Sequence, residues 1–214
     1  MLRDPFKPLP TPPLGFDEWL IIVLAVICAF AFFVKNCHGQ ELPVMEKEKA
    51  AQWVQLEYSN HWKGHKKMSF GRALGFVRDI SLDCFVFGLN FDETLAQFSW
   101  ESGFVNNIQD MKKKPSAWSF GIAGLGVATA HEEARRLKIP SDFPPHELIA
   151  NEELNIFLGC ARMSHLLNVY GGDLNRAEIA YNAGIHGEKE GHGKHYPIDI
   201  FATMLKWKAF KKVP

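Results

Sequence analysis

The chain of 214 residues has no excess of either charge, because 24 lysine and arginine residues balance 24 aspartate and glutamate residues. A nucleic-acid-binding protein normally carries a strong basic excess, so this balance argues against nucleic acid as a partner. Two local basic clusters, at residues 61–67 and 206–212, are most simply solvated surface.

Cysteine is scarce, and none of the four cysteines has the paired spacing of a metal site. Cys84 and Cys160 fall in the part of the chain that we expect to fold. A disulfide between them is one interpretation in an oxidising compartment. Two buried free thiols are the simpler one.

The sequence also has no internal repeat and no alternating stretch long enough for a sheet-based fold. It predicts a mostly α-helical chain in four parts. Residues 1–15 carry five prolines and are expected to be extended. A membrane anchor over 16–36 and a helical connecting segment over 37–79 follow, and residues 80–214 form the main helical domain.

The anchor is predicted from sixteen uncharged residues, 19–34, which approach with Leu14–Phe16 the ~20 residues that span a bilayer. A cleaved signal peptide fits less well, because the acidic pair at 17–18 precedes the run. A lipoprotein site at Cys28 is weaker, since bulky Ile27 precedes it. A buried core helix is the remaining alternative. The flanking charges do not set the orientation of the anchor.

The first informative stretch, residues 87–104, predicts a helix that Asn90 or Asp92 caps and Gly103 ends. Glu101 then lies in the last turn, at the negative end of the helix dipole and among aromatic residues. Both surroundings disfavour a carboxylate, so we expect this acid to hold its proton near neutral pH. Cleavage of a glycosidic bond needs such a proton donor. The alternative is an ordinary surface glutamate.

Three further stretches follow. Residues 119–130 are rich in glycine and alanine and lead into a helix over 130–137, and small residues there permit close approach of a neighbouring helix or a sugar chain. Asn151 is expected to cap a helix over 151–167, and a helix over 172–184 carries Tyr181 and Asn182 near its end.

The order of these motifs resembles the lysozyme-like domain of lytic transglycosylases over roughly residues 80–205. The motifs are Glu-Ser-Gly-Phe, Ser-x-Gly with Thr-Ala, Asn-Ile-x-x-Gly and Ala-Tyr-Asn-Ala-Gly, and a stretch over 196–201 is similar to the start of the closing helix of the family. The resemblance implies an α-helical lysozyme-like fold with a glycan cleft and makes Glu101 the match to the single catalytic glutamate. The implied substrate-binding residues are Tyr181, Asn182, Ser119 (with Ser116 as its rival), Ser102 and Gly121.

One motif departs from the family pattern. The family usually reads Gly-Leu-Met-Gln in the glycine-rich stretch, with the glutamine lining the cleft. Here the equivalent is residues 121–124 or 124–127, and neither has the methionine or the glutamine. The departure concerns contacts with the glycan and leaves the acid itself unaffected.

The resemblance implies cleavage of the β-1,4 bond between N-acetylmuramic acid and N-acetylglucosamine in peptidoglycan, with a 1,6-anhydromuramyl product and no cofactor or metal. A single carboxylate suits this outcome, whereas hydrolysis usually enlists a second. Asp110 is the candidate second acid for the alternative of a hydrolytic muramidase. Another alternative is a non-catalytic peptidoglycan-binding or assembly protein on the same scaffold. His186, His192 and His195 are more readily a mobile loop than a metal site.

The setting is predicted from the same features. The resemblance and the anchor imply a single-pass membrane protein whose catalytic domain faces the periplasm and the cell wall. A short anchored chain is similar to the local wall-openers of phage particles and secretion machines. We therefore expect virion or secretion-machine proteins as further partners.

Overall fold

The computed structural model describes residues 42–62, 67–109, 114 and 118–213. The proline-rich start and the anchor predicted over 16–36 lie outside these residues. Within the described part, none of the helices combines the length and the apolarity that crossing a membrane requires.

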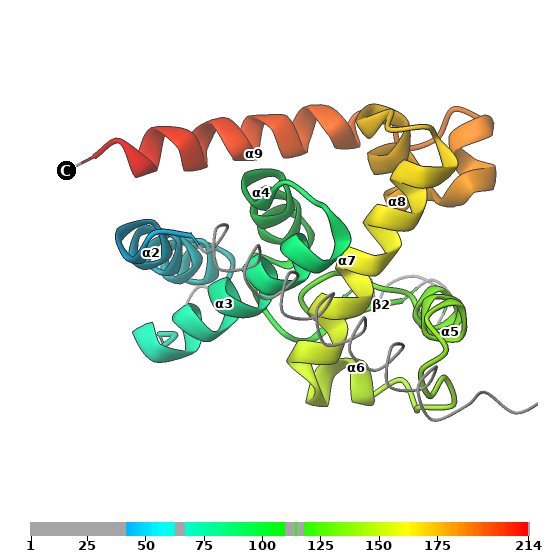
Figure 1. Cartoon of the computed structure of the whole chain (residues 1–214), viewed down its shortest axis with the longest axis horizontal. Coiled ribbons are helices and arrows are strands. Elements are labelled where there is room, and N and C mark those ends of the chain that lie inside the picture. Colours follow the sequence, from blue (N-terminus) through cyan, green and yellow to red (C-terminus); the bar gives the residue numbers. More distant parts are fainter. Residues whose placement is uncertain (1–41, 63–66, 110–113, 115–117, 214) are drawn as a thin grey trace, which may run out of the picture. The chain divides into compact units, whose positions relative to one another are not determined.

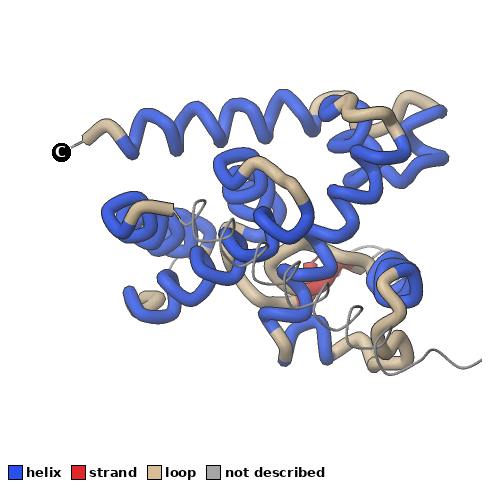
Figure 2. The backbone as a smooth tube through the Cα atoms, viewed as in Figure 1, coloured by secondary structure: helices blue, strands red, loops and turns tan. Residues whose placement is uncertain are grey.

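The described part of the chain is mostly α-helical, as predicted, and its strands are two residues long (Figures 1 and 2). In chain order the elements are α2 (Val44–His61), α3 (Phe70–Phe87), α4 (Phe91–Ser102), β1 (Ile108–Gln109), β2 (Ser119–Phe120), α5 (Val127–Arg136), α6 (Glu147–Ala150), α7 (Glu152–Val169), α8 (Leu174–Lys189) and α9 (Tyr196–Lys211). The strands pair antiparallel, with Gln109 opposite Ser119.

Capping residues set the ends of α4 and the start of α7, the helices that carry Glu101 and Asn155. The Asn90 side chain accepts a hydrogen bond from the Glu93 amide at 3.1 Å and caps α4, which ends at Gly103 with a φ of 56°. Asn151 caps α7 in the same way, at 3.0 Å from the Leu154 amide. These three predictions are confirmed. Asn is suited to the start of a helix because its short polar side chain accepts a hydrogen bond from a free backbone amide. Gly is suited to the end because it tolerates positive φ.

The predicted end of the next helix at Gly184 is confirmed only in part. Gly184 has a φ of 76° and a ψ of 160°, so the helical path breaks there, yet further helical turns continue to Lys189 as the last part of α8. A left-handed glycine interrupts a helix without preventing the chain from resuming it.

The described part of the expected connecting segment, from residue 42 to residue 79, does not stand apart from the domain. Residues 42–214 form one compact unit, and a boundary at residue 79 would fall inside α3. Trp53 of α2 is 3% exposed and packs against Trp207 of α9, with ring centroids 6.0 Å apart. The buried residues of α2, which are Ala50, Ala51, Trp53 and Val54, therefore belong to the same core as α9. The sequence pattern alone did not indicate this shared core.

A buried cluster of charged side chains joins α5 to α7. Glu133 is fully buried and accepts hydrogen bonds from Arg136 at 2.6 Å, His165 at 2.9 Å and Arg162 at 3.1 Å. Burial by itself would raise the pKa of Glu133, but these donors hold that pKa below its ordinary value. The cluster fixes α5 against α7, because separating the helices would leave the charges unpaired.

Cys84 of α3 and Cys160 of α7 are both buried and both free thiols, which confirms the simpler interpretation of the cysteines. Burial, and next the neighbouring Cys84, raise the pKa of the Cys160 thiol well above its ordinary value. Such a thiol is neutral and unreactive, and it acts as a small apolar side chain in the core.

Asp83 gives the fold a pH dependence. It is 7% exposed, and burial, followed by the charges of Asp79 and Glu153, raises its pKa from 3.8 to about 7. The folded state therefore keeps a proton that the unfolded chain releases near pH 4. The contribution of this group to stability is full below that pH and is lost as the pH rises through about 7.

We expect Asp83→Asn to remove the loss of stability that Asp83 causes as the pH rises. The free energy of unfolding at pH 8 should then increase by on the order of 1 kcal/mol. Urea unfolding between pH 4 and 8 measures it, with the exposed Asp142→Asn as the matched control. Equal pH slopes for the wild type and Asp83→Asn would refute this account of Asp83.

Candidate active site

Glu101 lies in the last turn of α4, as predicted, with its side chain half-buried. The hydroxyl of Tyr196, the first residue of α9, donates a hydrogen bond to Oε1 of Glu101. Tyr196 itself is only 4% exposed. Two helices far apart in the sequence thus fix one oxygen of the acid, and α9 lies alongside α4 in Figure 1.

The other carboxylate oxygen lies against the glycine-rich turn after β2. A β-carbon added to Gly124 would come within 2.5 Å of Oε2 of Glu101, and Gly124 has a φ of 63°. Only glycine fits here, because a side chain would collide with the acid and would also strain the backbone. The missing side chain therefore allows the carboxylate to lie directly on the turn.

Helix α7 holds this turn, residues 121–124, in place. Asn155 is fully buried; its Oδ1 accepts from the Ala123 amide at 2.8 Å, and its Nδ2 donates to the Phe120 carbonyl at 3.0 Å. One turn later, a β-carbon on Gly159 would come within 2.5 Å of that of Ala123. The Asn-Ile-x-x-Gly motif thus supplies a polar clamp and a close backbone approach at one place.

Tyr181 of α8 completes the group. Its hydroxyl donates to the Ala123 carbonyl at 2.8 Å, so it ties α8 to the same turn. Burial, and next the charge of Glu101, raise the pKa of Tyr181 well above its ordinary value, and the same two causes in the same order act on Tyr196. Both phenols therefore stay protonated and act as hydrogen-bond donors beside the acid.

Two of the predicted contact residues, Ser102 and Gly121, support the turn from inside the protein. The Ser102 hydroxyl is buried; it donates to the Ile122 carbonyl at 2.8 Å and accepts from the Phe104 amide at 3.0 Å. Gly121 is also buried, and a β-carbon there would collide with the Asn155 side chain. The structure gives both residues to the support of the turn, which leaves little of their surface for a ligand.

The remaining predicted contacts lie near the edge of the group. Ser119 is half-buried in β2, opposite Gln109. Asn182 is exposed, and its Oδ1 lies close to Gly193, in the turn that precedes α9. Their contact with a substrate stays a prediction.

Other sequence candidates are only partly placed. Asp110 and Ser116 lie outside the described residues. His186 and His192 are exposed, and both lie near Glu190, at 3.1 Å and 3.9 Å. Among the described residues, no group of three acidic, cysteine or histidine side chains forms a metal-binding cluster.

Three residues of the site were not predicted as such. Tyr196 appeared only as the start of a helix, Gly124 only as one of several small residues, and Asn155 only as part of a motif. The proximity of Tyr196 depends on chain folding over 95 residues, for which no local signal exists. Pro197 marks only the start of α9, since proline favours the first turn of a helix.

Residues 91–197 match the family model of the transglycosylase SLT domain, a range that begins with α4 and includes Glu101, Tyr181 and Tyr196. Among solved structures, an inactive Glu-to-Gln mutant of the lytic transglycosylase Slt from Pseudomonas aeruginosa is similar. The alignment covers 73% of this chain and 29% of that chain, with a TM-score of 0.55 and 17% sequence identity. This likeness shows a shared fold, and the chain spans less than a third of that protein. A search of curated proteins gave no match.

We expect Asn155→Ala to lower the free energy of unfolding by about 2–4 kcal/mol, because it removes two hydrogen bonds and leaves the buried amide of Ala123 unpaired. Chemical denaturation measures the loss. Asn168→Ala, at an exposed position of the same helix, is the control and should stay within about 0.5 kcal/mol of the wild type. A loss of similar size in both variants would contradict the role of Asn155 as a clamp.

Proposed function

Since the chain belongs to the transglycosylase SLT domain family, we propose that it is a lytic transglycosylase that cleaves peptidoglycan glycan strands with Glu101 as its acid. The observation that carries the proposal is the position of the Glu101 carboxyl group, which lies between the Tyr196 hydroxyl and Gly124 inside the matched segment. The lytic transglycosylase Slt of similar fold was solved as an inactive mutant in which a glutamate is changed to glutamine.

In the proposed reaction, Glu101 gives its proton to the glycosidic oxygen between N-acetylmuramic acid and N-acetylglucosamine, and the bond from the muramyl C1 to that oxygen breaks. The carboxylate left on Glu101 then takes the proton of the muramyl 6-hydroxyl. The 6-oxygen bonds to C1 and closes a 1,6-anhydro ring. One carboxylate thus acts first as acid and then as base, and the protein ends in its starting protonation state.

The surroundings of Glu101 suit both roles. The Tyr196 hydroxyl donates to Oε1 and so fixes the orientation of the acid. A half-buried position limits the water that would compete with the 6-hydroxyl. The clamp on the turn keeps Gly124, and hence the acid, in one place, and such positioning is a large part of enzymatic rate.

We also propose that residues 16–36 anchor the protein in a membrane, with the catalytic unit facing the cell wall, for local opening by a phage particle or secretion machine. This proposal depends on the apolar run over 19–34. Alkaline extraction of membranes tests the anchor, because a membrane-spanning chain stays in the pellet. Release of the full chain into the supernatant would contradict it.

The test of the activity is digestion of purified peptidoglycan by the full chain and by Glu101→Gln, with mass spectrometry of the soluble products. We expect 1,6-anhydromuramyl ends from the wild type and a loss of release by about a thousandfold or more in the variant. Reducing muramic ends would instead indicate the hydrolytic muramidase. No release by the folded wild type would favour the non-catalytic scaffold, which the missing Gly-Leu-Met-Gln glutamine also favours.

The contact between Gly124 and Glu101 gives a prediction that tests the position of the acid. Gly124→Ala places a methyl group against Oε2 of Glu101, so we expect the rate of glycan release to fall about a hundredfold through displacement of the acid. Gly126→Ala is the matched control in the same stretch, because its nearest neighbour would be 3.9 Å away and its φ of −69° suits alanine. Equal rates in the two variants would show that Gly124 does not set the position of Glu101.

A further inference from the structure

One side of α9 exposes a stripe of large apolar side chains. Ile198, Phe201 and Leu205 are 63%, 55% and 50% exposed, and their spacing of three and four residues places them on one face of the helix. Ala202 lies among them and is also exposed. Helix α9 runs along the edge of the described part of the chain (Figure 1). Single apolar residues on a surface need no explanation, but a row of three at helical spacing indicates a face that something covers.

Lysines flank this stripe on both sides. At about 100° per residue, Lys206 falls on one side of the stripe and Lys208 on the other, and Lys212 follows directly after the helix. All three lysines are exposed. A lysine beside an apolar face lays its methylene groups along that face and keeps its ammonium group at the level of lipid phosphates. Such a pattern is typical of a helix that lies flat in the surface of an anionic membrane.

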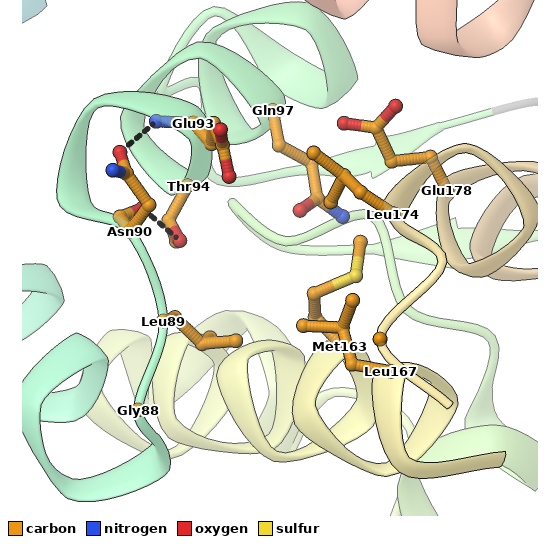
Figure 3. A pocket seen from close by; sticks show the side chains of 11 residues that line it. Gly88, Leu89, Asn90, Glu93, Thr94, Gln97, Met163, Leu167, Leu174 and Glu178 are labelled. Atoms are coloured by element: carbon orange, nitrogen blue, oxygen red, sulfur yellow. Dashed lines mark hydrogen bonds between the residues drawn. The ribbon is translucent and has the colours of Figure 1, made fainter. Parts of the chain in front are cut away.

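The carboxyl groups near α9 do not cancel these positive charges. Asp92 is already paired with Lys211, at 3.0 Å. Glu93 lies near Lys208, but it lines the cavity that α4 forms with α7 and α8 (Figure 3). Asp199 is the one acidic residue of α9, and it is half-buried. The charges along the stripe are therefore mainly positive and complement an anionic surface.

The opposite face of α9 carries the contact with the candidate acid. Tyr196 lies about 160° around the helix from Ile198, on the side where Trp207 is fully buried. The Tyr196 hydroxyl donates to Glu101 from this side. A membrane in contact with the stripe would therefore leave the candidate active site on the protein side of α9, away from the lipid.

The chain enters the compact unit beside the C-terminal end of α9. Lys49 of α2 donates to the carbonyl of Val213, which follows that end. The chain advances eight residues from residue 36, the end of the proposed anchor, to Val44, the first residue of α2, and these span at most about 28 Å. Helix α9, with 16 residues, is about 24 Å long. The proposed anchor would thus keep α9 within reach of the bilayer surface.

We propose that the stripe of Ile198, Phe201 and Leu205, with Lys206 and Lys208, docks α9 on the surface of an anionic phospholipid membrane. The docking rests on the proposed anchor, because a short tether to the same membrane makes a weak contact effective. Three side chains fall well below the roughly 800 Å² per partner that a stable interface with a second copy buries. Docking fixes the orientation of the catalytic unit above the membrane, whereas the anchor alone would let it rotate.

The test measures whether the stripe meets lipid. The full chain is reconstituted in phosphatidylglycerol vesicles and carries a nitroxide at Ala202→Cys, inside the stripe, or at the control Glu132→Cys, an exposed site on α5. Both chains carry Cys28→Ser and Cys37→Ser, and the two remaining native thiols are buried. Oxygen concentrates in lipid, whereas a water-soluble nickel complex stays outside. We expect the ratio of oxygen to nickel collisions to be several times larger at residue 202 than at residue 132.

Variants separate the docking from the anchor. We expect Phe201→Ser with Leu205→Ser to lower the ratio at residue 202 to that at residue 132, while the chain still resists release by alkali. Leu82→Ser with Val86→Ser, at exposed apolar positions of α3, is the matched control and should leave the ratio at residue 202 unchanged. Phosphatidylcholine vesicles, which carry no net charge, should give a smaller ratio at residue 202 than phosphatidylglycerol vesicles.

The outcomes distinguish the proposals. A low ratio at residue 202 in a chain that alkali does not release would overturn the docking and leave the anchor standing. Release of the chain by alkali would overturn both. Spin–spin broadening between labels at residue 202, equal in the two kinds of vesicle, would show that a second copy covers the stripe and would also overturn the docking. None of these measurements depends on glycan cleavage, so a failure of the proposed activity is seen separately.

Discussion

The close approach of the turn over residues 121–124 to both α7 and Glu101 is the constraint on which the candidate active site depends. Asn155 binds the turn at Ala123 and the residue before the turn at Phe120. Tyr181 binds the Ala123 carbonyl, and the acid lies against Gly124. Three helices thus meet at one four-residue turn. A shift of this turn would move the acid, because no side chain separates them.

The second support of the acid comes from α9, and it depends on packing far from the site. Trp207 is fully buried, and its Nε1 donates to Asp92 at 2.6 Å, at the start of α4. Lys211 adds ion pairs with Asp92 and with Glu46 of α2. These contacts fix α9 along α4 (Figure 1). At the other end of the same pair of helices, Tyr196 then reaches Glu101.

The sequence predicts the parts of this arrangement that depend on near neighbours. Asn90, Gly103 and Asn151 mark helix ends because capping involves residues within one turn. The resemblance pointed to Glu101 and Tyr181, and the structure places them on the two sides of the same turn. Ser102 and Gly121 belong to those motifs as well, but motifs do not separate residues that touch a ligand from residues that hold the loop.

The rest could not be predicted because it depends on contacts between distant segments. Nothing near Tyr196 indicates that it will meet Glu101, and nothing near Trp53 indicates that α2 shares the core with α9. The division expected at residue 79 has the same cause, since hydrophobic pattern locates a buried face but not the surface that covers it. The anchor over 16–36 remains a prediction, as it lies outside the described residues.

The most direct test of the central claim is a crystal structure of Glu101→Gln with a bound muramic-acid-containing oligosaccharide. If Glu101 is the acid, the side-chain amide that the substitution places at position 101 will lie within hydrogen-bonding distance, about 3 Å, of one glycosidic oxygen. The hydroxyl of Tyr196 should still contact residue 101. A saccharide bound with every glycosidic oxygen far from residue 101 would contradict the account.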